Sequence, residues 1–194
     1  MPKIDNTLFY QNAYKKYGQT PKGLNWTNKH SQQIRFELIA QYLKKLSSHK
    51  DSLIDAGCGF GDFYHYLVKE RIFVKYMGYD ILEKFVNIAK EKTKQPIMIK
   101  DILTDPLDEA DFYVASGSLN ILTPFETYLF IKRCFAHSKK AFIFNMLEGS
   151  YHDKYNLVNK KDILEYGKEL GAKVTIQSGY FMEDFTVCFA KLPL

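Results

Sequence analysis

The apolar positions of this chain follow two spacings in turn, which predicts alternating helices and strands. Apolar side chains recur at helical spacing over residues 29–47, and a shorter helix is expected over residues 7–17. Further along, short continuous apolar runs alternate with helical segments. Continuous runs of this kind are typical of a mostly parallel sheet covered by helices on both faces. The runs expected to form strands cover residues 52–55, 74–81, 96–102, 111–116, 140–147, 172–180 and 184–191.

The last two runs follow each other closely, so we expect them to form an antiparallel pair at one edge of the sheet. The whole pattern predicts an α/β fold built on a Rossmann-like, doubly wound sheet of seven strands. In such sheets, ligands bind at the carboxyl ends of the strands. No linker, repeat or low-complexity segment divides the chain, so residues 1–194 are expected to form a single domain.

Composition narrows the class of protein. Of the 194 residues, 46% are hydrophobic and 25% are charged, which is ordinary globular usage. The net charge is +5, but the lysines are scattered in pairs, which favours solvated helix faces over a nucleic-acid surface. Three widely spaced cysteines predict neither a disulfide framework nor a metal site. With no signal peptide and no apolar run of membrane-spanning length, we expect a cytoplasmic protein.

The most informative segment is a glycine-rich turn directly after the first expected strand. Its sequence is Asp55-Ala-Gly-Cys-Gly-Phe-Gly61, with glycines at positions 57, 59 and 61. Such a turn brings a ligand close to the backbone and to the start of the next helix. A Walker phosphate loop requires Gly-Lys-Ser/Thr, but Asp62 follows Gly61. The dinucleotide fingerprint requires glycine at position 62, where the aspartate would also repel a pyrophosphate.

The pattern Asp-x-Gly-x-Gly-x-Gly instead resembles the first motif of class I S-adenosylmethionine-dependent methyltransferases. The resemblance implies S-adenosylmethionine as the cofactor and a strand order of 3-2-1-4-5-7-6 with the last strand antiparallel. It also implies that the turn, through Asp55, Gly57, Cys58 and Gly59, contacts the cofactor. The ligand of this family is a sulfonium zwitterion, with which an acidic residue in the turn is compatible.

Three later strand ends carry residues that fit the same resemblance. It implies that Asp80 binds the ribose hydroxyls and that Ile81 covers one face of the adenine. It likewise implies that Asp101 binds the adenine amino group, with the backbone N–H of Ile102 on a ring nitrogen. Ser116 would lie where cofactor and acceptor meet. Asp80 is also suited to capping the next helix or to binding NAD, and Asp101 is also suited to the role of a turn residue.

A closer resemblance covers several short segments, which together are similar to an uncharacterised bacterial group of methyltransferases. This match implies the cofactor and not the acceptor. The segments are Tyr17-Gly, Asn25-Trp, Gln32-Gln-Ile-Arg-Phe36, Val114-Ala-Ser-Gly, Phe144-Asn-Met-Leu and Asp184-Phe-Thr.

The N-terminal residues 1–48 are rich in aromatic side chains, and we expect them to form a helical lid over a cofactor-binding core of residues 49–194. Two of their side chains are candidate cofactor contacts. Arg35 either clamps the methionine carboxylate or makes a surface salt bridge, for example with Glu37. Trp26 either stacks near the sulfonium or packs against the core.

Methyl transfer requires positioning of the acceptor and removal of a proton rather than a nucleophilic triad. The residues best placed to touch an acceptor are Asn120, Glu148, Tyr151 and His152, of which Asn120 and His152 are candidate catalytic groups. The Asn/Asp-Pro-Pro-Tyr/Phe motif of many nucleic-acid amine methyltransferases is absent, since residues 117–120 read Gly-Ser-Leu-Asn. We therefore expect a small-molecule acceptor.

Three other functions stay open at the level of sequence. The chain is a candidate tRNA or protein methyltransferase, for which binding to RNA would depend steeply on salt. It is also a candidate cofactor-binding partner subunit without catalysis of its own. An NAD-dependent oxidoreductase is the third alternative, which the glycine spacing and the final antiparallel pair disfavour.

Overall fold

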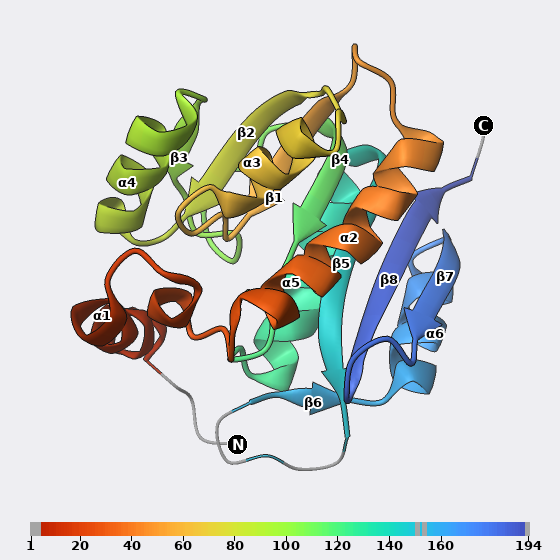
Figure 1. The fold of residues 1–194 in the computed structure, drawn as a ribbon. Helices are drawn as coiled ribbons and strands as arrows, with labels where there is room; N and C mark the ends of the chain where they lie inside the picture. Colours follow the sequence, from red (N-terminus) through yellow and green to blue (C-terminus); the bar gives the residue numbers. More distant parts are fainter. Residues whose placement is uncertain (1–4, 150–151, 153–154, 193–194) are drawn as a thin grey trace.

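A computed structural model of the chain describes residues 5–149, 152 and 155–192. Its centre is one sheet with the strand order β3-β2-β1-β4-β5-β8-β7, to which the short strand β6 adds by pairing with β5 (Figure 1). The strands are β1 (Ser52–Ala56), β2 (Lys75–Asp80), β3 (Ile97–Ile99), β4 (Ala110–Ala115), β5 (Ser138–Glu148), β6 (Leu157–Val158), β7 (Ala172–Ser178) and β8 (Asp184–Lys191).

The strands β3, β2, β1, β4 and β5 run parallel, whereas β8 is antiparallel to both β5 and β7. Counting the seven longer strands, this confirms the predicted order 3-2-1-4-5-7-6 and the reversed last strand. The sequence did not predict β6, because two residues are too short for any periodic pattern.

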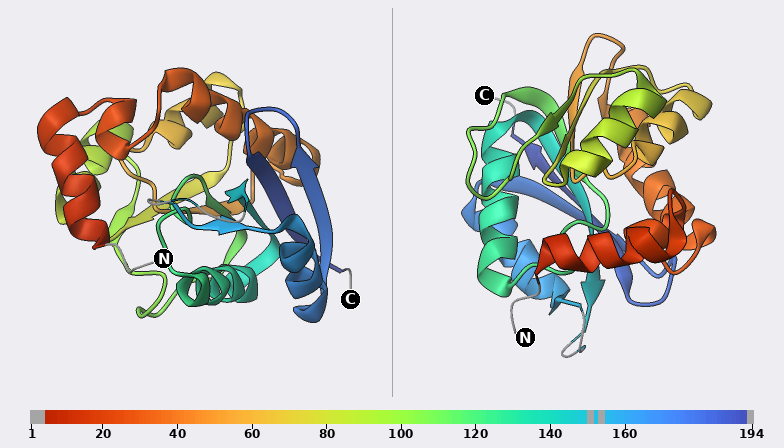
Figure 2. Two further views of the ribbon diagram at one scale, coloured as in Figure 1. Left: turned by 90° about the horizontal axis from the view of Figure 1, so that it is seen from below. Right: turned by 90° about the vertical axis from the view of Figure 1, so that its left-hand side faces the viewer.

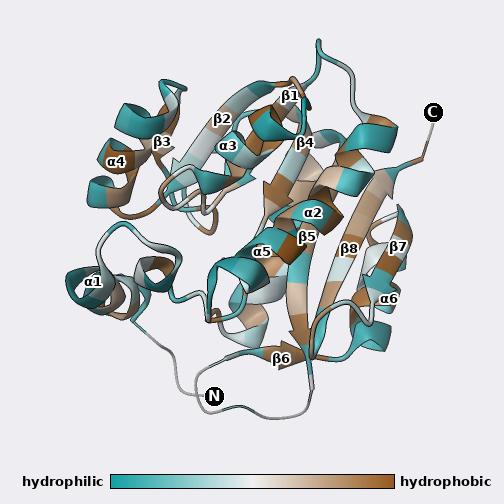
Figure 3. Ribbon diagram, in the orientation of Figure 1, coloured by the Kyte–Doolittle hydropathy of each residue, from teal (hydrophilic) through white to brown (hydrophobic). Residues whose placement is uncertain are grey.

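Helices cover both faces of the sheet. The apolar sides of α2, α3 and α4 pack on one face, and those of α5 and α6 pack on the other (Figure 2, left). In Figure 3, hydrophobic colour follows the central strands and hydrophilic colour dominates the outer turns of the helices. The helices are α1 (Asn6–Tyr17), the 3-10 turn η1 (Pro21–Leu24), α2 (Lys29–Leu46), α3 (Asp62–Lys69), α4 (Glu83–Thr93), α5 (Pro124–His137) and α6 (Lys160–Glu169).

Two features of this arrangement determine what lies at the carboxyl edge of the parallel strands. Because β8 runs in the opposite direction, its first residue, Asp184, lies at that edge, in register with Leu147 near the end of β5. The N-terminal α1 and η1 approach the same edge from the other side (Figure 1). The ring of Tyr14 packs 5.9 Å from that of Phe60 and 5.9 Å from that of Phe85.

The packing of α6 against the sheet gives a direct test of the fold. A Cβ atom at Gly167 would lie 2.6 Å from Cζ of Phe189 and would also meet Val174. Alanine is normally the better helix former, but here we expect Gly167→Ala to lower the free energy of unfolding by about 1–3 kcal/mol through overpacking. Urea denaturation measures the change.

The exposed neighbour Lys168 in the same helix supplies the control. Lys168→Ala is expected to change the free energy of unfolding by less than about 0.5 kcal/mol. A stabilised Gly167→Ala variant would show that α6 does not pack closely against β7 and β8.

Candidate functional site

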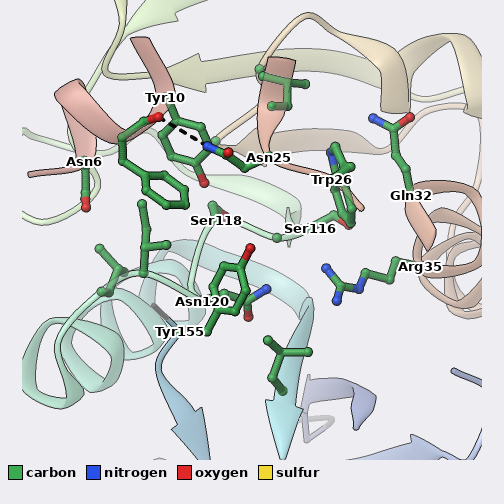
Figure 4. Close-up of a pocket in the computed structure, with 18 of the residues that line it drawn as sticks. Asn6, Tyr10, Asn25, Trp26, Gln32, Arg35, Ser116, Ser118, Asn120 and Tyr155 are labelled. Atoms are coloured by element: carbon green, nitrogen blue, oxygen red, sulfur yellow. Dashed lines mark hydrogen bonds between the residues drawn. The ribbon is translucent and has the colours of Figure 1, made fainter. Parts of the chain in front are cut away.

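A cavity of about 760 Å³ lies at the carboxyl edge of the sheet, between the strand ends and the N-terminal segment (Figure 4). Its size is within the range of small-molecule sites, about 300–1,000 Å³. All of the cofactor residues expected from the sequence line it. They are Trp26, Arg35, Asp55, Gly57, Cys58, Gly59, Asp80, Ile81, Asp101, Ile102 and Ser116.

The glycine turn is held by hydrogen bonds to the neighbouring strand. The backbone N–H groups of Gly57 and Cys58 both donate to the carbonyl of Tyr79, at 2.8 and 2.9 Å. Gly57 and Gly59 have φ angles of +85° and +55°, which side chains rarely tolerate. A Cβ at Gly57 would lie 2.6 Å from Cβ of Ser118, so a larger residue there has no space. The backbone of the turn therefore forms one wall of the cavity.

Asp80, the last residue of β2, links this turn to the next helix. Its Oδ2 accepts from the N–H of Gly59 at 2.9 Å, and its Oδ1 accepts from the N–H of Leu82 at 3.0 Å. Burial raises the pKa of Asp80 to about 6, although these hydrogen bonds lower it. A carboxylate has about four acceptor positions, so the group keeps capacity for ligand hydroxyls.

Asp55 is the second buried carboxyl group of the cavity wall. The hydroxyl of Tyr76 donates to its Oδ2 at 2.7 Å. Burial is the main reason that the pKa of Asp55 rises to about 7, and the nearby charges of Asp80 and Asp62 raise it further. A positively charged ligand would therefore be favoured here, because it would relieve the repulsion among these groups.

The raised pKa of Asp55 predicts how stability depends on pH. The folded protein binds this proton more tightly than the unfolded chain, whose aspartates have a pKa of about 4. Raising the pH from about 4 to about 7 therefore lowers the free energy of unfolding. Asp55→Asn removes this effect. Denaturation at several pH values between 4 and 7 should therefore show the free energy of unfolding of the variant rising relative to that of the native protein, by at most about 1.4 kcal/mol per pH unit.

Above pH 7 the difference between the two proteins should become constant. Asp162→Asn, at an exposed position of α6, is the matched control and should show a much smaller change with pH. A difference for Asp55→Asn that does not vary between pH 4 and 7 would contradict the account of this carboxyl group.

The end of β3 contributes Asp101 and Ile102 to the cavity, and the chain after it forms a loop that leads to β4 without an α-helix. Oδ1 of Asp101 accepts from the N–H of Leu103 at 2.8 Å, which fixes the turn that follows β3. Ile102 is buried, and Ile81 lies exposed just after the end of β2. Asp101 thus serves as a turn residue and also lines the cavity with the two isoleucines, so the two sequence interpretations of Asp101 are compatible.

Arg35 makes a contact that neither sequence interpretation included. Its Nε and Nη2 donate to the two carboxylate oxygens of Asp184, both at 2.5 Å, and both residues are buried. The guanidinium carbon also lies 4.9 Å from the centre of the Trp26 ring. Burial raises the pKa of Asp184 and the hydrogen bonds from Arg35 lower it, with burial the larger effect. No signal in the sequence links these two residues, which are 149 positions apart.

This ion pair joins α2 to the start of β8, and its loss should be costly. Asp184→Ala leaves a buried guanidinium without its partner, so we expect the free energy of unfolding to fall by about 3–5 kcal/mol. Chemical denaturation tests this value. The control is Glu165→Ala, which removes an exposed ion pair with Lys161 and should leave stability almost unchanged. Equal effects of the two variants would contradict a buried role for Asp184.

Trp26 both packs and lines the cavity. A Cβ at Gly117 would lie 3.1 Å from the Trp26 ring, and the ring of Phe36 is 6.1 Å away, nearly at right angles. Below it, the hydroxyl of Ser116 donates to Oδ1 of Asn145 at 2.8 Å. Nδ2 of Asn145 in turn donates to Thr186 at 2.7 Å. The Ser116 proton is therefore directed away from the cavity, and its oxygen is left as an acceptor.

The candidate acceptor residues differ in their surroundings. Asn120 is buried in the cavity wall, whereas His152 is exposed at the mouth. Glu148 is also part of the lining and forms an ion pair with Lys160 at 2.7 Å. Tyr151 lies outside the residues that the structure describes. Sequence reasoning missed Asp184 as a cavity residue, and it did not single out Tyr155.

The cavity is acidic although the chain as a whole has a net charge of +5. Its permanently positive side chains, among the described residues, are Arg35 and Lys100, and the Lys100 ammonium is already bound by Asp108 at 2.8 Å. This distribution favours a cationic ligand over a polyanionic one. The acidic residues of the lining are Asp55, Asp62, Asp80, Asp101, Glu148, Glu183 and Asp184.

Among the described residues there is neither a cluster of metal ligands nor a helix that could span a membrane. They contain no group of three or more histidine, cysteine, aspartate or glutamate side chains arranged to hold a metal ion. Across residues 5–149, 152 and 155–192, none of the helices combines the length and the hydropathy that crossing a membrane requires.

Comparison with known proteins gives a consistent result at the level of the fold. No family model matches the chain. A search of curated proteins found no match. Among solved structures, magnesium protoporphyrin IX methyltransferase (ChlM) from Synechocystis PCC 6803, with bound S-adenosylhomocysteine, superposes with a TM-score of 0.76 at 16% identity, over 96% of this chain and 97% of that one.

A TehB-like S-adenosylmethionine-dependent methyltransferase from Corynebacterium glutamicum gives a TM-score of 0.70 at 16% identity, over 96% of this chain and 100% of that one. A putative methyltransferase in complex with the Haloferax volcanii Trm112 activator gives 0.65 at 13% identity, over 84% and 93%. The chain therefore has the fold of S-adenosylmethionine-dependent methyltransferases. The resemblance that the glycine turn indicated is confirmed at this level.

Proposed function

We propose that this protein is an enzyme that transfers a methyl group from S-adenosylmethionine to a small-molecule acceptor. The observation that carries the proposal is the convergence of the glycine turn, the Asp80 carboxylate and the Arg35 guanidinium on one acidic cavity. These lie at the strand ends where folds of this kind bind ligands. The structural neighbours include a methyltransferase solved with S-adenosylmethionine.

The lining residues fit the chemistry of this cofactor. Asp80 retains acceptor capacity for two ribose hydroxyls, and the apolar side chains of Ile81 and Ile102 suit the faces of an adenine. Two of the five guanidinium N–H donors of Arg35 are used by Asp184, so three remain for a carboxylate. The acceptor oxygen of Ser116 suits an ammonium group.

When bound, S-adenosylmethionine supplies a methyl group activated by a positively charged sulfur. The chain's contribution is to orient both reactants and to exclude water. In our proposal Asp80 holds the sugar, Asp101 and Ile102 hold the base, and Trp26 and Arg35 hold the methionine end. The N-terminal residues 1–48 act as a lid, since Phe9, Tyr10 and Trp26 line the cavity from above the strand ends.

A nicotinamide dinucleotide is a poorer fit. The pyrophosphate of NAD requires backbone donors and a neutral or basic turn, but Asp62 begins α3 beside the turn. The acidic lining would also repel a dianionic pyrophosphate. The cavity's size and its aromatic side chains favour a small acceptor over a tRNA or a protein. The three described free cysteines are all buried, which suits a reducing compartment such as the cytoplasm.

The proposal is tested by titration calorimetry with S-adenosylhomocysteine, the product of the reaction. We expect saturable binding of one molecule per chain and no saturable heat with NADH. Asp80→Ala removes a buried, charge-assisted contact, so affinity for S-adenosylhomocysteine should fall by about 2–3 kcal/mol, roughly 30- to 150-fold.

Glu83→Ala is the matched control for Asp80→Ala, because it removes an exposed carboxylate in the first turn of α4, away from the cavity lining. Its affinity should equal that of the native protein. Tight NADH binding without S-adenosylhomocysteine binding would refute the methyltransferase proposal. Native affinity in Asp80→Ala would remove Asp80 from the binding site.

A further inference from the structure

The part of the cavity beyond the cofactor residues has a predominantly apolar wall. It is built by the segment after β4, helix α5, the end of β5, Tyr155 just before β6 and the N-terminal helix. The side chains are large and several are aromatic, so the space suits a flat, apolar molecule. They include Phe9, Tyr10, Ile121, Phe130, Leu147 and Tyr155.

One polar group stands out in this wall. Asn120 is more than nine-tenths buried, since only 6% of its surface is exposed. Its Oδ1 is shielded from water and has no hydrogen-bond partner among the residues that the structure describes. Figure 4 shows Asn120 and Tyr155 among the side chains that line the cavity, across from Arg35. A buried acceptor without a donor is costly, so it points to a group that a ligand must supply.

The backbone of Asn120 is held by a hydrogen bond, whereas the oxygen of its side-chain amide is available to bind a ligand. The N–H of Asn156 donates to the carbonyl of Asn120 at 2.5 Å, and Nδ2 of Asn156 donates to Thr127 at 2.8 Å. These bonds hold the position of residue 120 without using its amide. Rotation about the Cβ–Cγ bond, which is a soft and roughly two-fold torsion, would exchange Oδ1 with Nδ2 and so present Oδ1 to a ligand in the cavity.

The two permanent cations of the described lining, Arg35 and Lys100, are both paired with carboxylates, so neither is free for an anionic acceptor. Arg35 is neutralised by Asp184 through two hydrogen bonds, and its remaining donors are assigned above to the methionine carboxylate. Glu148 is held by Lys160 nearer the mouth. An anionic acceptor group beside Asn120 would therefore be desolvated without a partner, which is strongly unfavourable.

The buried Oδ1 of Asn120 lacks a donor among the described residues, and an N–H or O–H of a ligand would supply one. Building on the proposed function, we infer that the methyl acceptor is a planar aromatic molecule without an anionic group, whose N–H or O–H donates to Oδ1 of Asn120.

In the transfer step, a lone pair of the acceptor nitrogen or oxygen forms the new bond to the methyl carbon. The carbon–sulfur bond breaks and leaves its electron pair on sulfur, which becomes a neutral thioether. The acceptor's proton is released to water, because an amide oxygen is too weak a base to keep it. Asn120 therefore orients the acceptor and does not act as a general base.

The experiment uses two probes of nearly the same shape and titrates them into protein saturated with S-adenosylhomocysteine. Indole is planar and uncharged and carries one N–H donor, and 1-methylindole lacks that donor. We expect indole to bind the native protein about fivefold more tightly, the contribution of one net hydrogen bond. Indole-3-carboxylate should bind more weakly than indole, because it carries an unpaired charge into the cavity.

Three variants assign the preference to Asn120. In Asn120→Ala, the ratio of the Kd of 1-methylindole to the Kd of indole should fall to about one, while the affinity for S-adenosylhomocysteine should stay unchanged. Asn120→Asp keeps an acceptor oxygen and should retain the preference, which preserves the test if the alanine variant does not fold. Asn6→Ala changes another asparagine of the cavity lining and should retain it as well.

The inference is overturned by any of several results. These are equal binding of indole and 1-methylindole, a preference that survives in Asn120→Ala, tighter binding of the carboxylate, or no binding of any probe. The affinity for S-adenosylhomocysteine separates this failure from that of the proposed function. If S-adenosylhomocysteine binds and the probes do not discriminate, only the acceptor inference is wrong.

Discussion

The structure of the site depends on the hydrogen bond between the Asp80 carboxylate and the N–H of Gly59. This bond holds the glycine turn against the end of β2, and the carbonyl of Tyr79 reinforces it through Gly57 and Cys58. The parallel register of β1 and β2, with Asp55 beside Gly78, brings these strand ends together. A single carboxylate thus shapes the cavity wall and keeps acceptor capacity for a ligand.

Holding that carboxylate in a buried position has an electrostatic consequence. Asp80 and Asp55 both have raised pKa values because burial disfavours their charged forms. The cavity is nevertheless acidic within a basic protein, because carboxyl groups outnumber cations in its described lining, which suits a sulfonium better than a phosphate. Perturbed carboxyl groups in a cavity are typical of functional sites, although structural networks also produce them.

The reversed direction of β8 is the second constraint. If β8 were parallel to its neighbours, its first residue would lie at the opposite edge of the sheet. Because it is antiparallel, Asp184 reaches the ligand edge and fixes Arg35 beneath Trp26. The direction of β8, which is a property of the whole fold, therefore determines the position of one guanidinium group.

Much of this arrangement could be predicted from local sequence. The apolar runs predicted the strands, the resemblance of the glycine turn supplied their order, and the glycine spacing together with Asp80 and Asp101 predicted which residues line the cavity. The Arg35–Asp184 pair could not be predicted, because no periodic pattern relates positions so far apart. The unpartnered oxygen of Asn120 likewise depends on which neighbours surround it in space, and the two residues of β6 are too few to produce a pattern.

A crystal structure of the protein grown with S-adenosylhomocysteine tests the central claim most directly. The account predicts ligand density in the cavity, with the ribose against Asp80, the adenine between Ile81 and Ile102, and the carboxylate toward Arg35. Density at another place, or a ribose remote from Asp80 in a fully occupied complex, would contradict it.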